Sequence, residues 1–127
     1  MIKILSIFGT RPEAIKFAPL IHALDKDERF DSRVVVTGQH RTMLDQMLAL
    51  FEITPHHDLD IMMKDQTLND ILANALLGLS AVIAKEQPDM ILVQGDTSTA
   101  LAGAMAGYRS RIPVGHVEAS LCSGDIY

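Results

Sequence analysis

The sequence predicts a doubly wound α/β domain, built on a Rossmann-like parallel sheet. Short apolar runs rich in branched residues alternate with longer segments whose apolar residues recur at helical spacing. The short runs are almost continuously apolar, as expected for strands that helices cover on both faces. Strands that alternate with helices are joined by right-handed crossovers, and such crossovers give a parallel sheet. A length of 127 residues fits a single domain, residues 1–127.

The chain begins with a strand and a capped helix. The run "IKILSIF" (Ile2–Phe8) is dense in branched apolar residues and predicts the first strand. Thr10 and Glu13 have the spacing of a capping box, in which each side chain binds a backbone N–H near the other residue. Pro12 falls in the first turn, where its missing N–H costs nothing. A helix is therefore expected over residues 10–27.

The strand–helix unit then recurs along the rest of the chain. The helix expected over residues 67–87 has a long apolar stripe and stops at Pro88. The helix expected over residues 96–110 has a face of alanine and glycine, which suits close packing. The remaining predicted elements are strands at residues 32–38, 59–62, 89–95 and 113–119, and a helix at residues 42–51. The apolar stripe of the third helix consists of Leu68, Ile71, Leu72, Ala75, Leu79, Val82 and Ile83.

Composition excludes several classes of protein. The net charge of −5, with no block of like charges, argues against a nucleic-acid or anionic-membrane surface. No apolar stretch approaches the ~20 residues of a membrane span, and no signal peptide is expected because Lys3 interrupts the first apolar run. The single cysteine forms no internal disulfide, which favours a reducing cytoplasm.

The chemistry is expected at the carboxyl ends of the strands, where sheets of this kind bind ligands. After the first strand, Gly9, Thr10 and Arg11 combine a turn, a helix N-terminus and a cation, and Lys16 lies about one turn further on. This pattern suits a phosphate or another anion. The alternative is a capped helix with a solvated arginine. The glycine fingerprints of dinucleotide and P-loop sites are both missing.

Two carboxylates follow later strands. Asp96 either caps the next helix or faces the ligand, and Glu118 ends an apolar strand, where its charge needs a partner. Two carboxylates above one sheet can serve as acid and base. His40 and His116 flank strand ends and remain open as ligand contacts.

A metal site is not expected. His56, His57 and Asp58 are adjacent, but neighbouring side chains of an extended segment point in opposite directions, and no further ligand has a fitting spacing. A solvated loop is favoured for this segment. Cys122 has no base motif nearby, so a nucleophilic role is disfavoured.

Four stretches together carry a resemblance to a known family. They are "FGTRPEAIKFAPL", "VTGQHRTMLDQML", "VQGDTSTALAGAMA" and "RIPVGHVEA". In this order they closely resemble the N-terminal domain of the non-hydrolysing UDP-N-acetylglucosamine 2-epimerases, from residue 1 to residue 127. The resemblance implies one half of a GT-B-like two-domain fold, with the active site in the cleft between the halves. It also implies interconversion of UDP-GlcNAc and UDP-ManNAc, without a cofactor.

The resemblance assigns roles residue by residue. Asp96 and Glu118 match catalytic carboxylates of the family, and Arg11 matches a contact of the nucleotide diphosphate. Lys16 matches an electrostatic supporter of that contact. The residues expected to bind substrate are therefore Arg11, Lys16, Gly9, Thr10 and His116.

Some members of the family bind a second UDP-GlcNAc as an activator. Gln39 and Gln66 match positions used for that molecule. Thr42 and Asp65 differ from the polar or basic residues that some members carry there.

Two positions depart from the family pattern V-E-A-G-L-R-T. Ser120 stands in place of the glycine and Cys122 in place of the arginine. The family's remaining catalytic residues and most uridine contacts lie further on, and the chain covers about a third of the family's length. The leading interpretation is thus a truncated or split 2-epimerase, inactive alone. The alternatives are a non-catalytic module that binds a nucleotide sugar or pairs with a separately encoded C-terminal half, or half of a GT-B glycosyltransferase. The expected partners are UDP-GlcNAc or UDP, a separately encoded C-terminal half, and further copies of the chain in a homo-oligomer.

Overall fold

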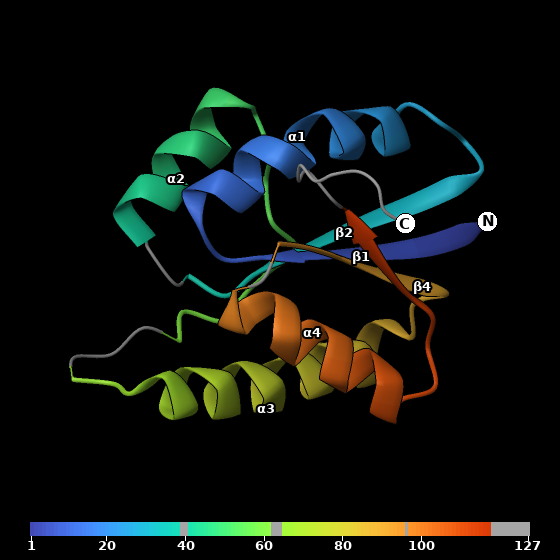
Figure 1. The fold of residues 1–127 in the computed structure, drawn as a ribbon. Coiled ribbons are helices and arrows are strands. Elements are labelled where there is room, and N and C mark those ends of the chain that lie inside the picture. Colours follow the sequence, from blue (N-terminus) through green and yellow to red (C-terminus); the bar gives the residue numbers. More distant parts are fainter. Residues whose placement is uncertain (39–40, 62–64, 96, 118–127) are drawn as a thin grey trace, which may run out of the picture.

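A computed structural model describes residues 1–38, 41–61, 65–95 and 97–117, and these form a three-layer α/β domain around a five-stranded parallel sheet (Figure 1). The sheet order is β3-β2-β1-β4-β5. The predicted fold class is confirmed. The strands are β1 (Ile2–Phe8), β2 (Phe30–Val36), β3 (His57–Asp58), β4 (Met90–Gln94) and β5 (Val114–Val117). The helices are α1 (Arg11–Asp25), α2 (Arg41–Leu50), α3 (Leu68–Glu86) and α4 (Ser98–Arg109).

The order of the strands reverses between β1 and β4. The chain first builds outward from β1 to β2 and β3, then returns to place β4 and β5 on the other side of β1. Helices α1 and α2 cover one face of the sheet, and α3 and α4 cover the other (Figure 1). The crevice at such a reversal point is the usual ligand site of an open α/β sheet.

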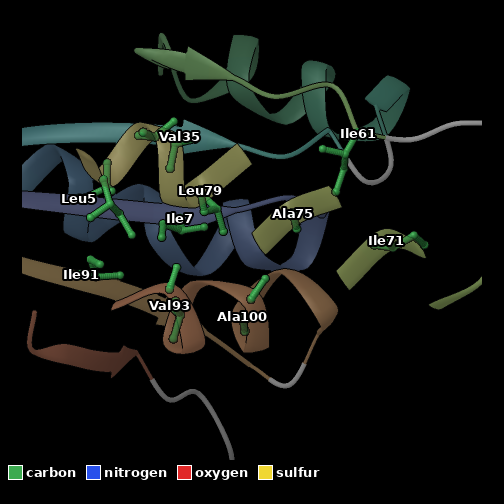
Figure 2. Packing of buried hydrophobic residues seen from close by; sticks show 14 residues of the cluster. Leu5, Ile7, Val35, Ile61, Ile71, Ala75, Leu79, Ile91, Val93 and Ala100 are labelled. Atoms are coloured by element: carbon green, nitrogen blue, oxygen red, sulfur yellow. The ribbon is translucent and has the colours of Figure 1, made fainter. Parts of the chain in front are cut away.

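Each face of the sheet has its own apolar core. Under α1 and α2, the stacked rings of Phe8 and Phe17 lie 5.2 Å apart. On the opposite face, side chains of β1 and β4 meet those of α3 and α4 (Figure 2). Both faces of the central strands are therefore buried, which explains their almost continuous apolar sequence.

The alanine and glycine face of α4 lets this helix approach the sheet closely, as the sequence predicts. A Cβ atom added at Gly103 would lie 2.8 Å from a methyl of Val93, and one added at Gly107 would lie 2.6 Å from a methyl of Val114. Both distances are too short for a real side chain. The small residues therefore fix the distance between α4 and the strands β4 and β5.

Two expectations about individual elements are wrong in detail. The short strand expected at residues 59–62 lies slightly earlier, at His57–Asp58. Backbone hydrogen bonds from Leu59 to Val36 and from Ile61 to Thr37 continue beyond its end. Leu68, placed in the apolar stripe of α3, is 72% exposed, because it is the first residue of the helix and lies beyond the sheet that the rest of the stripe contacts.

The segment His56–Asp58 is not simply a solvated loop. His56 is exposed, but its Nδ1 accepts a hydrogen bond from the backbone N–H of Val34 at 3.0 Å. His57 lies in β3, and its Nε2 is 2.6 Å from Oε2 of Glu86. Pairing with β2 and with the end of α3 orders both histidines. Among the described residues, no group of three metal-ligating side chains comes together.

Helix α3 has the length and mean hydropathy (1.3) of a candidate membrane span. The sequence had suggested no such segment. One face of α3 packs in the core through Ile71, Ala75 and Leu79. A core helix of a globular protein passes the same test, so length and hydropathy alone do not indicate a membrane.

Candidate functional site

The candidate site lies at the carboxyl ends of β1 and β4, where the sheet order reverses. The turn after β1 contains Gly9 and Thr10, and the turn after β4 contains Gly95 and Thr97. The two strands are hydrogen-bonded neighbours. The turns, and the helices α1 and α4 that follow them, therefore begin side by side above the same edge (Figure 1).

The turn after β1 is closed by the predicted capping box. Thr10 is the N-cap of α1, and its Oγ1 accepts from the backbone N–H of Glu13 at 3.4 Å. Oε1 of Glu13 accepts from the backbone N–H groups of Gly9 and Thr10, both at 3.0 Å. It also accepts from the Thr10 hydroxyl at 2.9 Å. The Glu13 side chain thus binds the N–H groups that would otherwise face a ligand in this turn.

Glu13 makes one further hydrogen bond that the sequence pattern does not predict. Its Oε2 accepts from the hydroxyl of Thr97 at 2.7 Å, across 84 residues of sequence. Glu13 is only 1% exposed. The capping pattern identified this residue, but a local pattern reports nothing about a partner on another turn.

The cations at the start of α1 face outward. Arg11 and Lys16 are both exposed, and neither forms an ion pair with another residue in the described part of the chain. Because the backbone N–H groups of Gly9 and Thr10 are bound internally, an anion here would be held chiefly by side-chain cations and by the N-terminus of the helix.

The turn after β4 is anchored by its own cap and by β5. Thr97 is the N-cap of α4, and its Oγ1 accepts from the backbone N–H of Ala100 at 3.1 Å. The alternative that Asp96 caps this helix is therefore wrong. Gly95 has φ of +73°, a left-handed conformation that favours glycine. Its carbonyl accepts a hydrogen bond from Nε2 of His116 at 2.7 Å, which fixes the proton of His116 on that nitrogen.

A groove of about 410 Å³ opens beside this turn. Its walls are mainly apolar, and Thr97 and His116 contribute polar side chains. An apolar wall with a few polar groups is typical of small-molecule sites. The lining residues are Val93, Gly95, Thr97, Ala100, Leu101, Ala104, Val114 and His116.

The structure brings only part of the predicted site into view. Gly9, Thr10 and Arg11 follow β1 at the reversal point of the sheet, and Lys16 lies further along α1. His116 reaches the turn after β4 from the outer strand β5, through its bond to Gly95. Gln66 is half-buried and lies directly before Thr67, the N-cap of α3, away from the two turns along the chain. Outside the described residues lie Gln39, Asp96, Glu118, Ser120 and Cys122, together with His40.

The sequence matches one protein family. The family model of UDP-N-acetylglucosamine 2-epimerase matches residues 22–127. The chain is similar to the UDP-N-acetylglucosamine 2-epimerase of Yersinia pestis, with 59% identity over 98% of this chain and 33% of the relative. The enzyme of Escherichia coli K12 is 56% identical over the same shares. The chain thus spans about a third of the length of these curated relatives.

Solved structures of UDP-GlcNAc 2-epimerases are similar to the fold of this chain. A UDP-GlcNAc 2-epimerase from Neisseria meningitidis, bound to UDP-GlcNAc, aligns with a TM-score of 0.87 and 49% identity over 91% of this chain and 31% of that one. The Methanocaldococcus jannaschii enzyme in complex with UDP-GlcNAc and UDP aligns with a TM-score of 0.84 and 35% identity, over 91% and 32%. The match of the family model over most of the chain shows that it belongs to the UDP-N-acetylglucosamine 2-epimerase family.

Proposed function

We propose that this chain is the N-terminal nucleotide-sugar-binding domain of a UDP-GlcNAc 2-epimerase. The observation that carries the proposal is the pair of exposed cations on α1, with Arg11 at the reversal point of the sheet and Lys16 about one turn further along the helix. The same fold in the Neisseria meningitidis relative was solved with UDP-GlcNAc bound. A diphosphate is the anion that this combination of cations and helix N-terminus fits.

The reaction explains why carboxylates and cations are needed together. Inversion at C2 through a glycal breaks the C2–H bond and the C1–O bond, so that UDP leaves as a C1=C2 double bond forms. Re-addition of UDP at C1 and of a proton on the opposite face of C2 completes the epimerisation. These steps need a base, an acid and positive charge on the departing diphosphate.

The roles are assigned accordingly. Asp96 and Glu118 are proposed as the acid and base groups, because Asp96 stands between Gly95 and Thr97 in the sequence after β4, and Glu118 directly follows β5. Arg11, with Gly9 and Thr10 shaping its turn, is proposed to bind the diphosphate. Lys16 supports that charge. His116 is proposed to contact the substrate, and Gln39 and Gln66 the activating second nucleotide sugar.

The domain is proposed to be inactive by itself, because relatives are about three times as long. A separately encoded C-terminal half or a second copy of the chain would then complete the cleft, in the cytoplasm. An assay for conversion of UDP-GlcNAc by the chain alone is expected to show no turnover. Measurable turnover would overturn this part of the proposal.

Binding is tested by NMR titration of the chain with UDP and with UDP-GlcNAc. Shifts are expected around Gly9, Arg11 and Gly95 at millimolar ligand. Arg11→Ala is expected to weaken binding roughly tenfold, since one charge-assisted contact is lost. Arg29→Ala is the matched control, because Arg29 is also exposed but already pairs with Asp27. A wild-type chain without shifts at millimolar ligand contradicts the proposal.

A further inference from the structure

We propose that Glu13 is a positioning residue that, together with His116, holds the turn after β4 and so shapes the groove that Gly95, Thr97 and His116 line. The inference rests on the proposed function only in that this groove belongs to the ligand site. The physical coupling between the two turns stands on contacts among described residues. It extends the role of Glu13 beyond the capping of α1.

The hydrogen bonds of Glu13 exceed what a cap needs. A capping box requires one carboxylate oxygen on the N-cap backbone, and Oε1 supplies this to Thr10. The second oxygen is directed at Thr97 on a different turn. Glu13 is only 1% exposed, and a buried carboxylate is destabilising unless both oxygens accept hydrogen bonds. The contact to Thr97 therefore offsets part of the cost of burial.

Helix α3 shows the same device without the second contact. Thr67 and Asp70 form a capping box, with the Thr67 N–H donating to Asp70 Oδ2 and the Asp70 N–H donating to Thr67 Oγ1, both at 3.1 Å. This box is exposed, and both of these bonds join residues three apart in the sequence. Capping alone therefore does not require the burial of the carboxylate that is seen at α1.

The turn after β4 is held both at Gly95 and at Thr97. On one side, the Thr97 hydroxyl accepts from Ala100 and donates to Glu13. On the other side, the Gly95 carbonyl accepts from His116 of β5. Gly95 is thus tied to β5, and Thr97 is tied to the first turn of α1. Fixing the residues of a ligand site in this way lowers the entropic cost of binding.

Thr97 has two separate functions that substitution can divide. Its oxygen accepts the capping bond, which an aspartate can do as well. Its hydroxyl hydrogen bridges to Glu13, which an aspartate cannot do. Thr97→Ser keeps both functions, whereas Thr97→Asp keeps the cap, removes the donor and places two carboxylates together.

The hydrogen bond between positions 13 and 97 can also be rebuilt with donor and acceptor exchanged. In the double variant Glu13→Gln with Thr97→Asp, the new amide group can donate to the new carboxylate. The amide oxygen can still accept from Gly9 and Thr10. Recovery in the double variant cannot be explained by independent structural damage at two sites, because such damage would add.

The first measurement needs no ligand. Amide hydrogen exchange in the turn after β4 and the first turn of α4 is expected to rise roughly three- to tenfold in Thr97→Asp, as for the loss of one hydrogen bond. Thr97→Ser and the double variant are expected to stay near wild type. Asp70→Asn, the matched change in the α3 box, is expected to leave this turn unchanged. Unchanged exchange in Thr97→Asp overturns the proposal, as does failure of the double variant to recover.

The second measurement is the affinity of the same variants for UDP. Thr97→Asp is expected to weaken binding severalfold, and the double variant to restore it, while Asp70→Asn binds as the wild type does. If the wild type does not bind UDP but the exchange pattern holds, the proposed function fails and the coupling stands. If the wild type binds and Thr97→Asp changes neither exchange nor affinity, the coupling is refuted.

Discussion

Two glutamates with little exposed surface tie distant parts of this domain together, and they use different partners. Glu13, at the carboxyl edge of the sheet, accepts only from uncharged donors on its own turn and on Thr97. Glu86, at the C-terminal end of α3, lies 3.3 Å from Lys3 Nζ and 2.6 Å from His57 Nε2. The partners of Glu13 are therefore neutral N–H and O–H groups, whereas the partners of Glu86 are ionisable side chains.

The difference explains where positive charge remains available. Lys3 is neutralised by Glu86, and the ion pairs Asp27–Arg29 and Asp31–Arg33 likewise lie away from the reversal point. At the carboxyl edge of the sheet, the carboxylate of Glu13 accepts hydrogen bonds from N–H and O–H groups. It therefore forms no ion pair with Arg11 or Lys16. A site for an anion needs this arrangement, because a paired cation binds a second anion poorly.

The largest loss of stability is expected from removing the carboxylate of Glu13. Glu13→Ala leaves two backbone N–H groups and the hydroxyls of Thr10 and Thr97 without an acceptor. The free energy of unfolding should fall by about 3–5 kcal/mol, measured by urea denaturation. If this variant does not fold, Glu13→Gln should fold with a smaller loss, because its oxygen still accepts in the turn. A loss below about 1 kcal/mol for Glu13→Ala would show that the buried bonds contribute little.

The contacts of Glu86 should contribute less to the free energy of unfolding than those of Glu13, and their contribution should depend on pH. The hydrogen bond from His57, followed by that from Lys3, lowers the pKa of Glu86 below its ordinary 4.5. A lowered carboxyl pKa stabilises the fold above the unfolded value and loses this contribution as pH falls through the folded value. Glu86→Gln should cost about 1–2 kcal/mol at pH 7, and its deficit should shrink below pH ~4.5. Urea denaturation at both pH values checks this, and a deficit that is independent of pH argues against it.

The exposed capping box of α3 should contribute less than either glutamate. Asp70→Ala removes one capping acceptor that solvent can replace, so a loss of about 0.5–1 kcal/mol is expected by thermal or urea unfolding. Leu68 beside it is exposed, so no core packing is disturbed. A cost as large as that of Glu13→Ala would remove the contrast between the two boxes.

The smallest effect concerns His56. Partial burial of the ring, with a contribution from Arg33, lowers the pKa of His56 below its ordinary 6.5. For a histidine this favours the neutral form, so its contribution to stability is present above pH ~6.5 and declines as pH falls. Because the ring is largely exposed, the change should be a few tenths of a kcal/mol. NMR titration should place the midpoint of His56 below its ordinary 6.5, and a midpoint above that value would be inconsistent with this environment.

Most of the fold can be predicted from the sequence, because the signals are local. Alternating apolar runs and helical stripes predict the parallel sheet, and Thr10 with Glu13 predicts the start of α1. The exposed positions of Arg11 and Lys16 follow from the helical spacing of Ala14, Phe17 and Ala18, which turns that face to the sheet. The same reasoning misplaced Leu68, because periodicity does not show where the opposing sheet ends.

The sequence by itself thus determined the elements, their caps and the residue types at the strand ends. Only the tertiary structure decided which of those residues meet. The bond of Glu13 to Thr97 spans 84 residues and that of His57 to Glu86 spans 29. Caps and helix faces depend on residues three or four apart. Partners at longer range depend on the order in which strands assemble, here with β4 beside β1, and no local interaction records that order.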